Sequence, residues 1–86
     1  MNFRFSNHAL EEMERRGISR EMLESVLISP QQTITERDGK KAYQSQIDFG
    51  GGRMYLLRAI VNDVLDPAVV ITVYRTRNMQ KYWRPQ

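Results

Sequence analysis

The spacing of apolar residues changes at Pro30, and this change constrains the fold more than any other feature of the sequence. Before Pro30, apolar residues recur every three or four positions, which is typical of helices that bury one face. After Pro30, apolar and polar residues alternate, which indicates strands. A proline also disfavours helical backbone at the preceding residue, here Ser29. The pattern predicts an α+β domain whose elements follow the order ααββββ.

Two short helices are predicted before Pro30. Ser6 and Ser19 can accept hydrogen bonds from the first free N–H groups of helices over residues 7–16 and 20–28. Gly17 is expected to adopt the left-handed conformation that ends the first helix. The two helices should therefore form a compact helical hairpin.

Four strands are predicted after Pro30. Asp38 and Gly39 suit the two positive-φ positions of a type I′ turn, and Gly50 to Gly52 form a second turn. We expect a twisted four-stranded antiparallel sheet with the helical hairpin across one face. A short N-terminal strand near Phe3 to Phe5 and a helical C-terminal tail are compatible with this pattern. The expected strands span residues 32–37, 40–49, 54–61 and 69–73.

Length and composition exclude several classes of protein. Eighty-six residues predict one domain, over residues 1–86. The chain has no cysteine and one histidine, and its aspartates are isolated, so neither a metal site nor a cofactor is expected. No apolar run is long enough to cross a membrane, and no signal peptide is apparent. We therefore expect a cytoplasmic protein without a membrane partner.

The charge is distributed unevenly along the chain. Residues 1–36 hold four basic and six acidic groups, for a net charge of −2. Residues 37–86 hold nine basic and four acidic groups, for a net charge of +5. Four cations and three rings fall within residues 74–84, a mixture suited to phosphate and unpaired bases. The same rings could instead pack back across the sheet as a lid.

Arg58 interrupts an otherwise apolar strand, YLLRAIV. A buried guanidinium without a partner would be very unfavourable. Arg58 therefore either pairs with a carboxylate such as Asp48 or Glu36, or lies on an open concave face that binds a ligand. If the register aligns Arg58 with Arg75, the two would form a cationic pair suited to phosphate.

His8 is predicted in the first turn of the first helix. A neutral imidazole there can act as a base, and His8, Glu12 and Arg15 share one helical face. The alternative is a solvated face with a local contact between His8 and Glu12. The sequence does not decide between the two.

Two segments, FSNHALEEMERRGISREMLESVLISPQQTI and VVITVYRTR, resemble a family of small prokaryotic proteins described as domain of unknown function 4258. That family is generally placed near the RelE/ParE-like toxins, including the BrnT group. The resemblance implies a helical pair against a curved antiparallel sheet, and metal-independent cleavage of RNA by its 2′-hydroxyl. The matching positions would be Arg58, Tyr74, Arg75 and either Lys81 or Tyr82.

Together, residue chemistry and resemblance predict a toxin of a toxin–antitoxin system, with RNA or the ribosome as target and an antitoxin protein as partner. A homodimer is also compatible with this function. The alternative is a non-catalytic module that binds a protein through its tail or a sheet edge. The expected catalytic residues are His8, Arg58, Tyr74 and Arg75, and the expected RNA-binding residues are Arg53, Arg77, Lys81, Tyr82 and Trp83.

Overall fold

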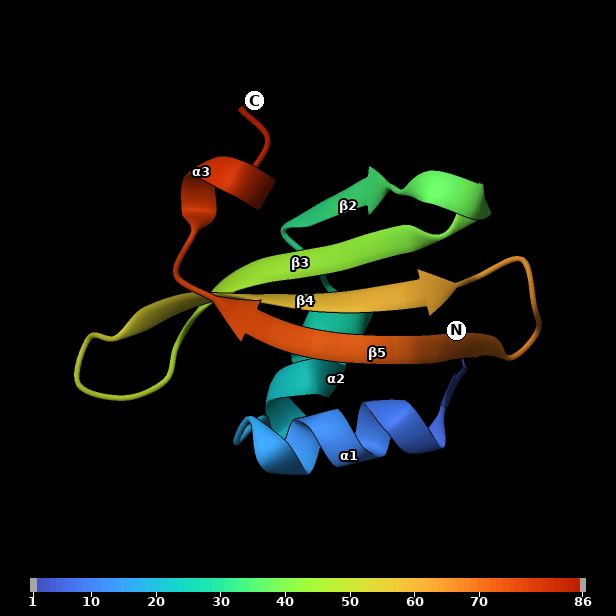
Figure 1. Cartoon of the computed structure of the whole chain (residues 1–86), viewed down its shortest axis with the longest axis horizontal. Helices are drawn as coiled ribbons and strands as arrows, with labels where there is room; N and C mark the ends of the chain where they lie inside the picture. The colour runs from blue at the N-terminus through green and yellow to red at the C-terminus, as the bar shows by residue number, and fades with distance from the viewer. Residues whose placement is uncertain (1, 86) are drawn as a thin grey trace.

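The computed structural model describes residues 2 to 85, which form five strands, three α-helices and one short 3-10 helix (Figure 1). The two helices that precede the main strands lie close to where the sequence predicts them. In chain order the elements are β1 (Phe3–Phe5), α1 (Asn7–Arg15), α2 (Arg20–Ile28), β2 (Gln32–Thr35), η1 (Arg37–Gly39), β3 (Lys41–Asp48), β4 (Met54–Asn62), β5 (Ala68–Thr76) and α3 (Met79–Tyr82).

The sheet has five strands in the order β1-β5-β4-β3-β2. Strands β2 to β5 pair antiparallel, as predicted, but β1 adds a parallel strand beside β5. The expected four-stranded antiparallel sheet is therefore corrected to a five-stranded mixed sheet. The reason is that Phe3–Phe5 pairs with Ala68–Val70, at the far end of the chain, and three residues carry too weak a pattern to predict this partner.

Local capping explains why the helices begin and end where they do. The hydroxyl oxygen of Ser6 accepts from the Ala9 N–H at 3.0 Å, and that of Ser19 accepts from the Met22 N–H at 3.1 Å. Gly17 has φ of 63°, the left-handed conformation expected after α1. Both predicted caps and the glycine turn are confirmed.

The β2–β3 turn also has the predicted chemistry. Asp38 and Gly39 have φ of 62° and 74°, as a type I′ turn requires. The Lys40 N–H donates to the Arg37 carbonyl at 3.3 Å. This turn fixes the register of the β2–β3 hairpin, which places Gln32 opposite Gln44.

The two faces of the sheet differ in what covers them. Helices α1 and α2 pack on one face, and in Figure 1 α2 passes behind β4 and β5. The core between them includes Leu23, Leu57 and Val73, each fully buried. The opposite face, which we call the open face, is approached by α3 and by Arg84, which follows it. Within residues 2 to 85, no helix is both long and apolar enough to cross a membrane.

Candidate active site

A polar cluster centred on Arg58 lies on the open face of the sheet. The register places Arg58 of β4 between Gln44 of β3 and Tyr74 of β5. Directly opposed residues of neighbouring strands point to the same face, so all three side chains project away from α1 and α2. The Arg58 side chain is only 4% exposed. A guanidinium at this depth needs partners for its N–H groups.

Each guanidinium nitrogen of Arg58 has a partner. Its Nε donates to Gln44 Oε1 at 2.7 Å, and its Nη2 donates to Glu36 Oε1 at 2.7 Å. Its Nη1 donates to the Tyr74 hydroxyl. Of the two alternatives for Arg58, pairing with Glu36 is confirmed. We call Glu36, Gln44, Arg58, Tyr74 and Tyr82 the Arg58 cluster.

Helix α3 closes the Arg58 cluster from above. The Tyr82 ring lies 4.3 Å from the Arg58 guanidinium carbon and meets the Tyr74 ring edge-on at 6.0 Å. The Tyr82 carbonyl accepts from Gln44 Nε2 at 3.2 Å. The C-terminal tail thus packs back across the open face, which was one of the predicted alternatives for its rings.

Gln32 holds the end of this tail in place. Its Nε2 donates to the Arg84 carbonyl at 2.6 Å, and its Oε1 accepts from the Arg84 N–H at 3.1 Å. The same Oε1 accepts from Gln44 Nε2 at 2.8 Å. Gln32 therefore links the tail directly to the residue that binds Arg58.

The two tyrosines of the cluster differ in acidity. Burial raises the pKa of Tyr74 above its ordinary value, and the nearby Arg58 only partly opposes this rise. A hydrogen bond with Lys81 is the main reason that the pKa of Tyr82 is lowered. Tyr74 is therefore protonated at neutral pH and can donate a proton, but it is not suited to act as a base.

Arg75 lies on the other face of the sheet. It stands opposite Leu57, whereas Arg58 stands opposite Tyr74. The cationic pair of Arg58 and Arg75, expected if the register aligned them, does not form. Arg75 instead packs on two rings, with its guanidinium carbon 4.4 Å from the centre of Phe49 and 4.7 Å from that of Tyr55.

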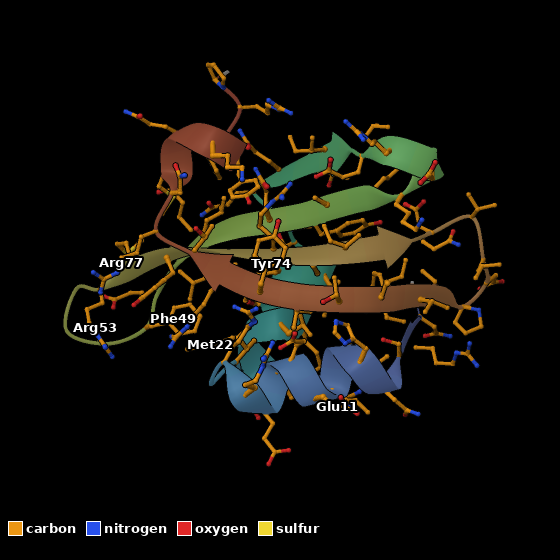
Figure 2. The ribbon with its side chains drawn as sticks, viewed as in Figure 1. Glu11, Met22, Phe49, Arg53, Tyr74 and Arg77 are labelled. Carbon is orange, nitrogen blue, oxygen red and sulfur yellow. The ribbon has the colours of Figure 1, made fainter. Side chains whose placement is uncertain are left out.

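Two predicted RNA-binding arginines, Arg53 and Arg77, lie near the rings on which Arg75 packs. The Arg77 guanidinium carbon is 5.0 Å from the Tyr55 ring centre. Arg53 donates to the carbonyls of Gly50 and Phe49 at 3.2 and 3.3 Å. Figure 2 shows Arg53 and Arg77 near Phe49 at the turn of the β3–β4 hairpin, well apart from the hydroxyl end of Tyr74.

His8 lies on α1, away from both groups. Its side chain is 60% exposed, and its Nε2 is 3.8 Å from Glu12 Oε1. Helix α1 covers the face of the sheet opposite the Arg58 cluster, so His8 cannot join that cluster. The structure supports the alternative for His8, a polar helix face with a local contact to Glu12.

Glu12 organises that helix face and makes stability depend on pH. A hydrogen bond from Arg15, whose Nε lies 2.8 Å from Glu12 Oε2, is the main reason that the pKa of Glu12 lies below its ordinary value. A carboxylate with a lowered pKa stabilises the fold above its ordinary pKa, and this stabilisation disappears as pH falls through the folded-state pKa. We expect Glu12→Gln to melt below wild type at neutral pH and to lose less stability on acidification below about pH 4.5. Thermal melting across this range, with exposed Glu11→Gln as control, measures the difference; parallel curves for wild type and Glu12→Gln would contradict it.

The remaining predicted RNA-binding residues lie on α3 and just after it. Lys81 is exposed, with its ammonium 5.1 Å from the Tyr82 ring centre. Trp83 is partly buried and lines a shallow, mainly apolar groove with Met79 and Pro85. Only Tyr82 of this group contacts Arg58 directly.

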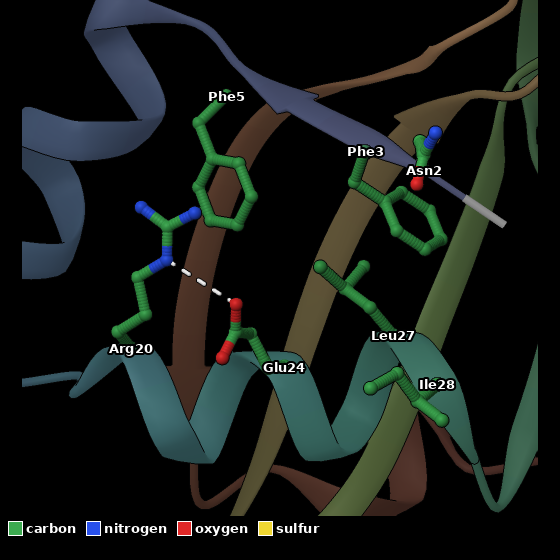
Figure 3. A pocket seen from close by; sticks show the side chains of 7 residues that line it. All are labelled: Asn2, Phe3, Phe5, Arg20, Glu24, Leu27 and Ile28. Atoms are coloured by element: carbon green, nitrogen blue, oxygen red, sulfur yellow. Dashed lines mark hydrogen bonds and ion pairs between the residues drawn. The ribbon is translucent and has the colours of Figure 1, made fainter.

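A groove between β1 and α2 offers little chemistry (Figure 3). It has a volume of about 230 Å³ and includes Phe3, Phe5 and the exposed Ile28. Its charged residues, Arg20 and Glu24, pair with each other at 3.4 Å. None of the predicted site residues lines this groove.

Two glutamines of the site were not predicted from the sequence, and Glu36 was considered only as an ion-pair partner. The signal for Gln44 is the recurrence of Gln44, Gln46 and Asp48 at every second position of the segment AYQSQID, which places them on one face of a strand. Gln32 opposes Gln44 across the β2–β3 hairpin, and its side chain is buried. A polar stripe on a strand of a small domain could have indicated a polar site on that face.

Comparisons with known proteins agree with the family suggested by the sequence. A protein-family model described as domain of unknown function (DUF4258) matches residues 5–75. The matched segment contains Glu36, Gln44, Arg58 and Tyr74, but not Tyr82. Neither a curated protein nor a solved structure gives a significant match. Among residues 2 to 85, no group of three His, Cys, Asp or Glu side chains could hold a metal ion.

Proposed function

Because the chain belongs to the family described as domain of unknown function (DUF4258), we propose its function from the Arg58 cluster: metal-independent cleavage of RNA by attack of a ribose 2′-hydroxyl. The observation that carries this proposal is the contact of one arginine with both a carboxylate and a phenol. Arg58 donates to Glu36 and to Tyr74 from separate nitrogens. The three groups supply a proton acceptor, a phosphate ligand and a proton donor within one contact network.

The residues have distinct roles in this reaction. Glu36 accepts the proton of the 2′-hydroxyl as its oxygen forms a bond to phosphorus. Arg58 stabilises the negative charge that develops on the phosphoryl oxygens. Tyr74 donates its proton to the 5′-oxygen as the bond from phosphorus to that oxygen breaks. The products are a 2′,3′-cyclic phosphate and a free 5′-hydroxyl.

Helix α3 must move before RNA can reach this cluster. The Arg58 side chain is 4% exposed, and the Tyr82 ring covers it at 4.3 Å. A partly exposed Glu36, at 33%, marks where the cluster opens to solvent. We propose that RNA displaces α3, and that an antitoxin protein inhibits the toxin by holding this face covered.

Two conservative variants test the proposed chemistry. We expect Glu36→Gln and Tyr74→Phe each to lower the cleavage rate by about 10²- to 10⁴-fold, since each removes one proton-transfer group and keeps its shape. A labelled single-stranded RNA is incubated with protein in EDTA, and its products are resolved by electrophoresis. Exposed Glu24→Gln on α2 is the matched control. Intact RNA in the presence of folded wild-type protein would refute the proposal.

A second candidate function is favoured by the closure over Arg58. Every guanidinium nitrogen already has a protein partner, and Gln32 secures the tail. Such a network also suits a structural role in a non-catalytic module that binds a protein. Salt separates the two functions. RNA binding releases counterions from the phosphates, so it weakens steeply as the salt concentration rises, whereas an apolar contact through Trp83 changes little.

A further inference from the structure

Three arginines and two aromatic rings gather at the turn of the β3–β4 hairpin, on the face opposite the Arg58 cluster. We call this group the arginine patch. Arg75 comes from the last part of β5, Arg77 from just after it, and the others from the hairpin. The patch consists of Phe49, Arg53, Tyr55, Arg75 and Arg77.

The register and the hairpin turn together build the arginine patch. Tyr55 pairs with Ile47, and Arg75 pairs with Leu57, so both side chains point to the helix-covered face. That face extends beyond the helices at the hairpin turn. Phe49 and Tyr55 meet edge-on there, with ring centres 5.3 Å apart and planes at 77°. The rings form a fixed platform for the guanidinium groups.

The cations of the patch differ from the arginines on α1 and α2 in their acidic neighbours. Among the described residues, no carboxylate lies within 4.0 Å of the side-chain nitrogens of Arg53, Arg75 or Arg77. The nearby Asp48 pairs in register with Met54, on the other face, and accepts from the Gly50 N–H at 2.7 Å. Arg15 and Arg20, by contrast, both pair with carboxylates on their own helices.

The patch is accessible as well as positive. Arg53 and Arg77 are exposed, and Phe49, Tyr55 and Arg75 are partly exposed. Hydrogen bonds to two hairpin carbonyls orient Arg53, and two rings orient Arg75. Ordered guanidinium groups lose less side-chain entropy when they bind phosphate than free ones do.

We propose that the arginine patch binds a single-stranded RNA segment, with phosphates on Arg53 and Arg77 and an unpaired base stacked beside Tyr55. Charge complementarity favours a polyanion, and the partly exposed Tyr55 ring favours one with unpaired bases. The inference deepens the proposed function, because it names single-stranded RNA as the substrate class. The inference rests on the proposed function only in naming RNA as the nucleic acid that binds.

The end of β5 connects the two sites. Tyr74 and Arg75 are neighbours on β5 and point to opposite faces. An RNA strand that lies on the patch therefore reaches the Arg58 cluster by passing around the end of β5. The patch would position the strand, and the cluster would cleave it.

Fluorescence polarisation with a labelled single-stranded RNA tests the inference. Glu36→Gln is used as the background, so that binding is measured without cleavage. We expect Arg77→Ala to weaken binding about 10-fold and to reduce the salt slope by about 0.7, the value for one phosphate contact to a single strand. Arg4→Ala, which removes an exposed arginine from β1, is the matched control and should bind as the background does.

Arg77 is exposed, so its loss should leave the fold intact. Arg75→Ala, which removes a partly buried member of the patch, is measured beside it. No binding by the background protein at low salt, or an equal loss with Arg4→Ala, would overturn the inference. Duplex RNA that binds as tightly as the single strand would overturn the stacking of an unpaired base. If wild type leaves RNA intact while Arg77→Ala weakens binding, the cleavage proposal fails and the patch stands. If cleavage depends on Glu36 but binding ignores Arg77, the patch fails and the cleavage proposal stands.

Discussion

Arg58→Ala is expected to lower the free energy of unfolding by about 2 to 5 kcal/mol, because it removes a large buried side chain and leaves the buried Gln44 without a hydrogen-bond donor. The substitution leaves Glu36 without its cation and Gln44 and Tyr74 without the donor that binds them. In a domain of this size, each kcal/mol shifts the melting temperature by about 4 to 8 °C. Urea unfolding followed by circular dichroism measures the change directly. RNA cleavage should also disappear.

The control for Arg58 is an arginine in an exposed ion pair. Arg20 and Glu24 are 57% and 49% exposed and lie 3.4 Å apart. Arg20→Ala should therefore change stability by about 0 to 1 kcal/mol. Similar losses for the two variants would show that Arg58 does not hold the open face together. Because Arg58→Ala affects both stability and chemistry, Tyr74→Phe remains the cleaner test of mechanism.

Gln32→Leu is expected to release α3 and increase RNA binding at the Arg58 cluster. Leucine cannot make the two hydrogen bonds that tie Gln32 to the Arg84 backbone. The loss of two bonds at about 0.5 to 1.5 kcal/mol each makes the open state about 5- to 150-fold more populated. As long as most molecules remain closed, the apparent affinity for RNA rises by the same factor as the population of the open state.

Two measurements check the release of α3. Hydrogen exchange of residues 79–84 should become faster in Gln32→Leu, and binding to labelled RNA should become tighter. Gln31→Ala is the matched control, since Gln31 Oε1 accepts from the Gln46 N–H at 2.9 Å and does not contact the tail. Faster exchange without tighter binding would show that α3 does not limit access to Arg58, and would favour the non-catalytic function.

The sequence predicts local structure well because local rules decide it. Ser6, Ser19 and Gly17 act within a few residues of their own positions, and the starts of α1 and α2 and the end of α1 follow from them. The Asp38-Gly39 turn is equally local. The pairing of β1 with β5 is not, since it joins residues about 65 positions apart and depends on which sheet edge remains free. For this reason the parallel strand was missed.

The candidate site could be predicted only in part. Arg58 is conspicuous as a charge in an apolar strand, and Glu36 follows as one of two plausible partners. Whether Tyr74 or Arg75 faces Arg58 depends on a register that the sequence does not reveal, and a shift of one residue exchanges them. The strands are further offset by an irregularity beside Ile60 and Val61. The convergence of His8 with Arg58 fails for a simpler reason, because α1 lies on the other side of the sheet.

The hydroxyl of Ser6 has a consequence for the order of folding. It accepts from Ala9 to start α1, and it also donates to the Ile71 carbonyl of β5 at 2.7 Å. The Ser6 side chain thus makes one contact within a single helical turn and a second contact, to Ile71, that closes a loop of 65 residues. Long-range closure is slow compared with helix formation. The contact within α1 can therefore form early, whereas the hydrogen bond to β5 needs the central sheet that carries both proposed sites.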